Sequence, residues 1–281
     1  LALDVSRSRA GAFLAGLLAA FSSPFFVHSL EHVFKYLGFG FVPLALLALR
    51  RVLERGSGRA YGAFFVVSAL VLLSDWYNAL YVLVGGAVLW AHRFVTATGE
   101  RPSLLRRTAA LAALLPPLAL VLAWTLAPVL AREAGTLRSP LAEQAAYSVD
   151  ALNVLLPHPY HPLWGPLTAE RLEALPGNVF EKTAFLGWAL PLALAVLAWR
   201  QRRDAALRPW LLLFAVFLLL ALGPALQWAG RSLLPLPGAW LGQVPGFAGS
   251  RASGRYMVVA ALALGVLAAL LVARQRRPGL T

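Results

Sequence analysis

Long apolar stretches, separated by short arginine clusters, constrain this chain more than any other feature of its sequence. Hydrophobic residues make up 59% of the 281 residues and charged residues only 13%, against about 25% in a typical soluble domain. So few charges cannot cover a water-soluble globule, and the surrounding medium must be mainly lipid. A helix needs roughly 20 apolar residues to cross the bilayer core. We therefore expect about eight spans, near residues 10–26, 34–49, 60–74, 76–92, 108–130, 184–199, 210–228 and 256–273.

The predicted fold is all-α: a polytopic transmembrane helix bundle that forms one transmembrane domain over residues 1–281. The apolar run at 60–92 is too long for one span, because at 1.5 Å per residue it would extend about 50 Å. Arginines flank both ends, so we expect a hairpin with its apex at 75–78. The loop at 131–183 is too rich in apolar residues to be disordered. We expect short helices in it, lying on the membrane surface.

Basic residues are concentrated on one side of the predicted membrane. The segments 1–9, 50–59, 93–107, 200–209 and 274–281 hold most of the arginines and few acids. This asymmetry is the positive-inside pattern, which predicts that both termini of the chain are cytoplasmic. The long loops, 131–183 and 229–255, are then extracytoplasmic. The net charge of +13 does not predict a nucleic-acid partner, since the arginines form short clusters at helix ends and no continuous stripe.

The first residue is Leu1, and no signal-peptide pattern follows it. We therefore expect the sequence to be a fragment that lacks its N-terminal part. The chain contains no cysteine. This composition excludes thiolate chemistry and leaves the redox compartment undetermined.

Residues 28–32 read HSLEH, which matches the H-x-x-E-H pattern of one class of zinc peptidases. On a helix, His28, Glu31 and His32 share one face, and two imidazoles on adjacent turns can bind zinc while the carboxylate acts as base. A peptidase also needs a distant third ligand, for which the only outer acid nearby, Asp75, is isolated. The alternatives are histidines that hydrogen-bond loop carbonyls and residues of a different substrate site.

Two further outer segments carry polar candidates. Asp75 lies between apolar runs in LLLSDWYNALY, where an acid either faces a cavity or partner or caps a helix. The segment 152–167, LNVLLPHPYHPLWGPL, has four prolines, which should make it extended. It either lies at the headgroup level or forms a rigid wall of a substrate cleft. In the second case His158 and His161 point into the cleft, and Asp150 adds a carboxylate.

The last outer loop places Arg251 and Arg255 where the chain re-enters the membrane, in VPGFAGSRASGRYMVV. Arginine is the preferred partner of phosphate groups, and the positive end of the helix dipole would add to the attraction. The alternative is that both side chains extend along a helix start to reach water.

The order of these features resembles a known family. A span with RAGAFLAGLLAAFS precedes the short His/Glu loop, and a hairpin with SDWYNALYVL follows it. Later come YSVDALNVLLPHPYHPLWG, NVFEKTAFLGWALPLALAVLA, FLLLALGPALQW and VPGFAGSRASGRYMVVAALALGVL. Over nearly its whole length the chain resembles the bacterial membrane proteins related to the GT-C glycosyltransferases, which use polyprenyl-phosphate-linked sugars.

The resemblance implies an outward-facing cleft for a lipid-phosphate sugar donor. In this superfamily the main catalytic acid lies in an outer loop that would precede Leu1, so the chain is expected to lack it. The remaining candidate acids are Glu31, Asp75 and Asp150. The substrate or lipid-phosphate would be bound by His28, His32, His158, His161, Arg251 and Arg255. No metal is firmly implied, although a divalent cation at His28 and His32 is left open.

The implied function is sugar transfer from a polyprenyl-phosphate donor to an extracytoplasmic glycan, lipid or protein. The implied location is a bacterial inner membrane, and the implied partners are the lipid bilayer and the lipid-linked sugar. The alternatives are a transporter or flippase of lipid-linked substrates and a non-catalytic membrane scaffold. A proton-coupled transporter needs ionisable groups deep in its spans, and the sequence shows almost none there.

Overall fold

The computed structural model describes residues 1–31, 37–133, 139–177, 180–181, 183–200, 204–244 and 247–275. In this part of the chain helices predominate, which confirms the predicted helical class. A single small sheet was not expected: β1 (Ala225–Trp228) pairs antiparallel with β2 (Arg231–Pro235). Packing divides the chain into two compact units. The first unit comprises Leu1 and Val33–Gly135, and the second comprises Ala2–His32 and Thr136–Thr281. That they form one transmembrane domain stays a prediction.

The first unit is made of helices, most of them apolar. They are η1 (Gly38–Gly40), α5 (Phe41–Arg55), α6 (Gly58–Ser74), α7 (Trp76–Thr96), η2 (Thr98–Glu100), α8 (Arg101–Ala112) and α9 (Leu115–Glu133). The predicted break at Asp75 is present: its backbone is extended, and its carboxylate accepts the Tyr77 N–H at 2.8 Å. Leu49, Leu53 and Leu104 form a core cluster in this unit.

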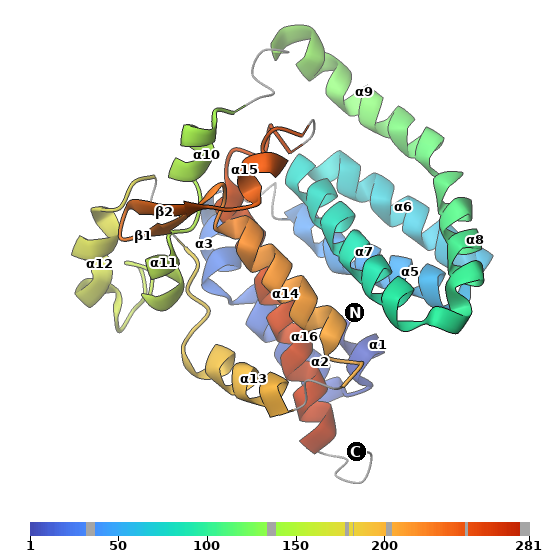
Figure 1. The fold of residues 1–281 in the computed structure, drawn as a ribbon, viewed down its shortest axis with the longest axis horizontal. Helices are drawn as coiled ribbons and strands as arrows, with labels where there is room; N and C mark the ends of the chain where they lie inside the picture. Colours follow the sequence, from blue (N-terminus) through green and yellow to red (C-terminus); the bar gives the residue numbers. More distant parts are fainter. Residues whose placement is uncertain are drawn as a thin grey trace. The chain divides into compact units, whose positions relative to one another are not determined.

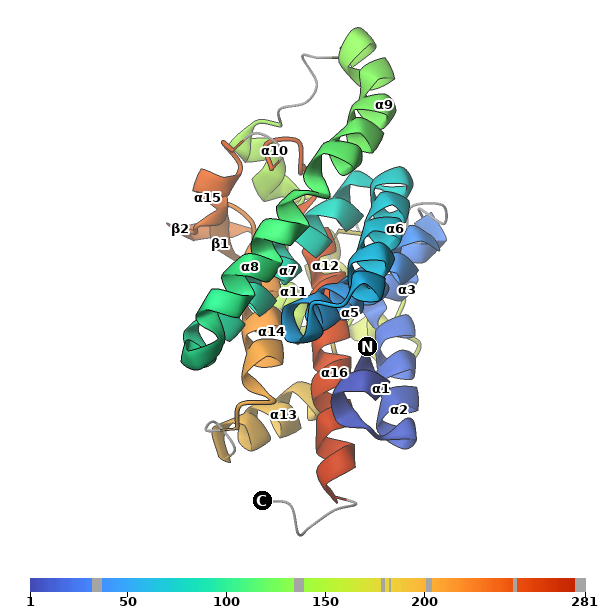
Figure 2. The same ribbon diagram turned by 90° about the vertical axis from the view of Figure 1, so that its right-hand side faces the viewer.

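The second unit is built around one buried helix, α16 (Met257–Gln275). Every residue from Met257 to Leu270 is buried. Figures 1 and 2 show α16 between α2 (Arg9–Ala20) and α14 (Arg208–Ala221), and both helices pack against it. The remaining elements are α1 (Ala2–Ser6), α3 (Ser23–Glu31), α10 (Leu141–Ala146), α11 (Ala151–Leu155), α12 (Gly165–Glu173), α13 (Ala189–Arg200), α15 (Gly238–Leu241) and η4 (Ser253–Tyr256).

Glycines allow α2 and α16 to approach closely. A Cβ added at Gly11 would lie 2.6 Å from the Ala269 carbonyl oxygen, and one at Gly265 would lie 2.9 Å from the Ala15 carbonyl oxygen. Both distances are shorter than van der Waals contact, so larger side chains would force the helices apart. Small residues at helix contacts are typical of packing inside membranes, where close backbone approach increases dispersion contacts.

The prediction of eight spans is not supported. Among the described residues, Trp76–Thr96, Thr98–Thr125 and Ser253–Gln275 are long and apolar enough to cross a membrane. The helices Arg9–Ala20 and Ser23–Leu30, bent by 50° at their junction, make a fourth if they are counted together.

The other predicted spans are shorter as helices. Where a span was predicted at 34–49, the helix α5 has only 15 residues, and one of its sides is buried within the first unit. In 210–228 the helix ends at Ala221, because Gly223 adopts φ +74° and Pro224 follows it, and β1 then begins. In 184–199 the helix begins only at Ala189. Apolar length alone therefore overestimated the number of spans, since it does not show where a helix stops.

The loop expected at 131–183 does contain short helices, α10, α11 and α12. Their position at the membrane surface stays a prediction. The segment 152–167 is not extended throughout, as its prolines suggested. Asp150 caps α11 by accepting the Leu152 N–H at 2.9 Å, and α11 ends before Pro157. Proline is tolerated in the first turn of a helix, as at Pro166 in α12.

Replacing Gly11 with alanine should destabilise the second unit, because its methyl group would meet the α16 backbone. We expect a loss of about 1–3 kcal/mol in unfolding free energy, as for other overpacked sites. Gly16, on the same helix, has nothing within 4 Å of an added Cβ. Gly16→Ala should therefore leave stability unchanged or raise it slightly. Thermal unfolding of both purified variants in detergent measures the difference, and equal melting temperatures would contradict the close packing.

Candidate functional site

A buried ion pair in the second unit joins Glu181 to Arg255. The Arg255 Nε donates to Glu181 Oε1 at 2.9 Å, and its Nη2 lies 2.8 Å from the same oxygen. His28 Nε2 lies 3.8 Å from Glu181 Oε2. The exposed fractions are 0% for His28, 1% for Glu181 and 8% for Arg255. Burying one of these charges alone would be costly, so each of the paired groups stabilises the other in place. We call the three residues the ion cluster.

The ion cluster connects three segments that are far apart in the sequence. His28 belongs to α3, Glu181 lies in the chain before α13, and Arg255 lies in η4, directly before α16. Gly254 permits this arrangement, because a Cβ there would lie 2.8 Å from the Glu181 carbonyl oxygen. The Gly254 N–H also donates to the Tyr147 carbonyl at 3.1 Å. The start of the central helix is therefore fixed by side-chain and backbone contacts together.

The two arginines predicted to clamp a lipid phosphate have different partners. Arg255 is held by Glu181. Arg251 is exposed, lies 3.4 Å from Glu143 Oε1, and stacks its guanidinium 4.9 Å from the centre of the Tyr147 ring. The pair therefore does not form a common phosphate fork. Arg255 holds the site together, and Arg251 keeps a guanidinium at the surface.

Two of the three candidate acids cap backbone groups. The buried Asp150 accepts N–H groups from Leu152, Ala229 and Gly230, the last at 2.7 Å. It thereby fixes the turn between β1 and β2, where Ala229 and Gly230 have positive φ. Asp75 caps α7. These contacts favour structural roles for both carboxylates.

The H-x-x-E-H pattern is described only in part. His28 belongs to the ion cluster, whereas His32 and the side chain of Glu31 lie outside the described residues. Within the described part of the chain, no three His, Cys, Asp or Glu side chains gather to hold a metal ion. The described residues therefore give no support to a zinc-peptidase centre.

Both histidines of the proline-rich segment stabilise turns. His158 Nδ1 accepts the Tyr160 N–H at 3.2 Å. His161 Nδ1 accepts the N–H groups of Leu163 and Trp164 at 3.3 and 3.2 Å. A neutral imidazole that accepts through Nδ1 carries its proton on Nε2. His158 is buried, but His161 lines a pocket, where its Nε2–H can donate to a ligand.

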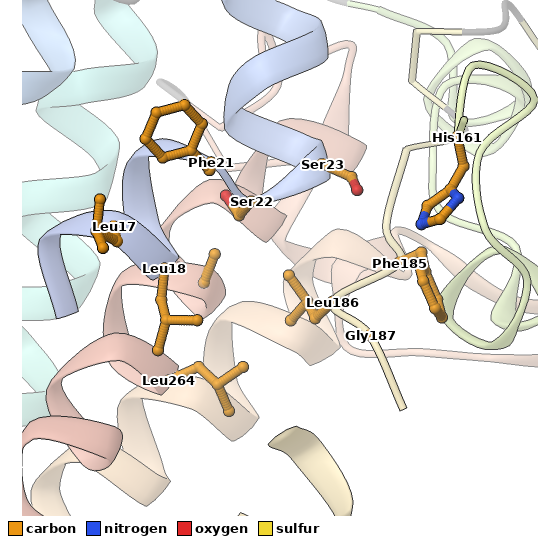
Figure 3. Close-up of a pocket in the computed structure, with 11 residues that line it drawn as sticks. Leu17, Leu18, Phe21, Ser22, Ser23, His161, Phe185, Leu186, Gly187 and Leu264 are labelled. Carbon is orange, nitrogen blue, oxygen red and sulfur yellow. The ribbon is translucent and has the colours of Figure 1, made fainter. Parts of the chain in front are cut away.

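This pocket has a volume of about 420 Å³ and is drawn in Figure 3. It forms where the chain bends between α2 and α3. Its apolar walls come from α2, α16 and the segment before α13, and its polar groups are two serines at the bend and His161. The lining residues are Leu17, Leu18, Phe21, Ser22, Ser23, His161, Phe185, Leu186, Gly187, Ala261 and Leu264. Figure 3 shows the Ser23 hydroxyl and the His161 ring facing the same space.

The pocket and the ion cluster are built from the same segments. Ser23 and His28 are both on α3, and Glu181 precedes Phe185 by four residues. Arg255 lies near the start of the helical stretch that supplies Ala261 and Leu264. The ion cluster therefore joins three segments that each contribute residues to the pocket lining. The lining contains no Asp, Glu, Lys or Arg among the described residues, which suits binding of an apolar molecule with a small polar group.

Sequence reasoning missed Glu181 and the pocket. Glu181 lies in the segment NVFEKTAFLGW, where a Glu-Lys pair interrupts an apolar and aromatic stretch. A carboxylate in such a run needs a partner if it is buried, and this was the available signal. Its partner is 74 residues away, however, and no local pattern indicates that pairing.

Replacing Glu181 with glutamine should be strongly destabilising, because it removes the counter-charge from the buried Arg255 guanidinium. Breaking a buried pair typically costs about 3–5 kcal/mol. Glu143→Gln, which breaks the exposed pair with Arg251, is the matched control and should cost at most about 1 kcal/mol. Chemical denaturation of detergent-purified variants measures both changes.

A double variant separates pairing from general disruption. Combining Glu181→Gln with Arg255→Met removes both charges and should be less destabilising than the sum of the two single changes. Strictly additive losses would show that the two side chains do not stabilise each other.

Comparisons with known proteins identify a family. No curated protein and no solved structure matches the chain. The profile of a protein family described as "Domain of unknown function (DUF6311)" matches residues 1–281, which is the whole of the sequence. The chain therefore belongs to the DUF6311 family.

Proposed function

We propose that this protein is an integral membrane glycosyltransferase of the GT-C type, which binds a polyprenyl-phosphate-linked sugar in the pocket of the second unit. The observation that carries the proposal is the pocket itself. It is mainly apolar, it has hydroxyl and imidazole groups among its lining residues, and it is built on apolar helices of membrane-spanning character. Its volume of about 420 Å³ falls within the range of roughly 300–1,000 Å³ of small-molecule sites.

The lining matches the two parts of such a donor. Leu18, Phe21 and Leu264 offer apolar surface to an isoprenoid chain, and burial of that surface contributes about 25 cal/mol per Å². Ser23 and His161 are suited to donate hydrogen bonds to phosphate oxygens, and hydrogen bonds to a charged acceptor are stronger than neutral ones. In this arrangement the phosphate is bound by these neutral donors, and the Arg255 guanidinium positions the walls.

The proposed reaction is transfer of the sugar to an acceptor hydroxyl. A carboxylate removes the hydroxyl proton, and the acceptor oxygen forms a bond to the anomeric carbon. The bond from that carbon to the phosphate oxygen breaks, and polyprenyl phosphate leaves with the bonding electrons. Hydrogen-bond donors stabilise the leaving phosphate. Among the three predicted acids, Asp75 and Asp150 are engaged with backbone N–H groups, so Glu31 is our candidate base.

The proposed location is a bacterial inner membrane, with both chain termini in the cytoplasm and the acceptor outside it. The arginines before the first apolar helix, in 1–9, and after the last one, in 274–281, support this orientation.

A transporter of lipid-linked substrates is a second candidate. The buried ion cluster favours it, because ionisable groups buried in membrane proteins commonly line substrate or proton pathways. The two candidates share the pocket and differ in whether the sugar leaves the lipid.

Photo-crosslinking in proteoliposomes tests the pocket. The probe is a radiolabelled, photoactivatable polyprenyl-phosphate sugar, and saturable labelling of the protein is expected. Leu18→Trp should lower labelling by about tenfold or more, equivalent to about 1.4 kcal/mol of binding free energy, because the indole fills the pocket. Phe13→Trp is the control, since Phe13 is on the same helix, 70% exposed and outside the lining.

The outcomes are distinct. Equal labelling of Leu18→Trp and Phe13→Trp would reject the pocket as the donor site. Saturable labelling with movement of the intact lipid-linked sugar across the bilayer, and no sugar transfer to any acceptor, would favour the transporter.

A further inference from the structure

Two long stretches of the second unit carry no charged residue. Residues 151–169 and 183–199 contain no Asp, Glu, Lys or Arg. The structure brings them together at Trp188. Its indole N–H donates to the Leu155 carbonyl at 2.8 Å, and its ring packs edge-on against Trp164 with centroids 6.0 Å apart. Two charge-free stretches that are separate in the sequence therefore meet on one surface.

The side chains at this junction are large, apolar and exposed. We define the aromatic face as Leu155, Leu163, Trp164, Leu167 and Trp188. Their exposed fractions are 48%, 74%, 45%, 73% and 51%, respectively. Single exposed apolar residues are ordinary on soluble proteins. A charge-free group of them that includes two tryptophans marks a surface that another apolar phase covers.

The composition of the face suits the boundary between lipid headgroups and acyl chains. Tryptophan is enriched at that depth, because its ring is apolar and its N–H needs a partner. The Trp188 N–H already has one inside the protein, so its ring can enter the acyl region without leaving a donor unsatisfied.

The helix that follows Trp188 supports the same position. α13 has 12 residues and is about 18 Å long, whereas the bilayer core is about 30 Å thick. Its Leu192 and Trp199 are exposed, and it ends at Arg200, which can reach the headgroups. The residues of α13 before Arg200 carry no charge, so the apolar surface continues from Trp188 along this helix.

We propose that the aromatic face lies in the headgroup–acyl boundary of the bilayer and holds the neighbouring pocket at that depth. Phe185 provides the connection: its ring contacts Trp188 at 5.1 Å and His161 at 6.3 Å between centroids, and both Phe185 and His161 line the pocket. A ligand then enters the pocket sideways from the lipid and does not come from bulk water. This inference does not depend on the transferase activity, since it concerns the surface beside the pocket.

Spin-label accessibility tests the proposal directly. The chain has no cysteine, so single-cysteine variants of the full chain carry one nitroxide each. Leu163→Cys and Leu167→Cys place labels on the aromatic face. Glu173→Cys is the control, since Glu173 is exposed and lies at the end of α12, the helix that carries Leu167. Each labelled variant is reconstituted in liposomes, and its collisions with oxygen, which concentrates in lipid, and with a water-soluble nickel chelate are measured.

We expect the ratio of oxygen to nickel collisions to be several-fold higher at positions 163 and 167 than at position 173. Nickel accessibility at positions 163 and 167 equal to that at position 173 would overturn the proposal, because the face would then be in water. Low accessibility to both reagents would also overturn it, because the face would then be covered by protein.

Discussion

The second unit depends on the buried pair between Glu181 and Arg255. Each charged group would be strongly disfavoured alone in an apolar interior, so neither side chain could be buried there without the other. It also has a fixed geometry, since two nitrogens of the guanidinium approach one carboxylate oxygen. The pair therefore brings the start of α16 next to the chain before α13. His28, which lies beside Glu181, adds the helix α3 to the same place. These segments carry the walls of the pocket, so the charge pairing inside the protein determines the shape of a mostly uncharged site.

The central helix α16 combines two kinds of contact that suit a membrane protein. Along its length it is apolar and packs closely through Gly265 against α2. At its start, Arg255 makes the charged contact. Both kinds of contact are needed, because an apolar helix surface is buried almost equally well by lipid and by another helix. Small-residue contacts and polar pairs are what specify the helix partner. The pocket at the α2–α3 bend lies between these two regions of α16, and a lipid-like ligand there would meet apolar walls and a few neutral donors.

Parts of this structure could be predicted from the sequence. Apolar stretches predicted the helical class. The length of the run at 60–92 and the arginines at both of its ends predicted the break at 75–78, because a local pattern decides both. The proline-rich segment was expected to be extended, but Pro157 and Pro166 leave room for α11 and α12 beside them. The number of spans was overestimated, since an apolar stretch can form a helix too short to cross the bilayer, as α5 does, or stop before a glycine, as α14 does. Arg255 was singled out as a phosphate ligand, and the structure pairs it with a carboxylate 74 residues distant. Such pairing has no local signature.

A cryo-EM map of the protein in lipid nanodiscs supplied with a polyprenyl-phosphate sugar would test the proposed donor site. We expect elongated density between the α2–α3 bend and α16, with its polar end beside Ser23 and His161. We also expect Glu181 and Arg255 to remain in contact. A pocket closed by its own side chains, or an Arg255 that has left Glu181 to bind the ligand phosphate, would contradict this proposal.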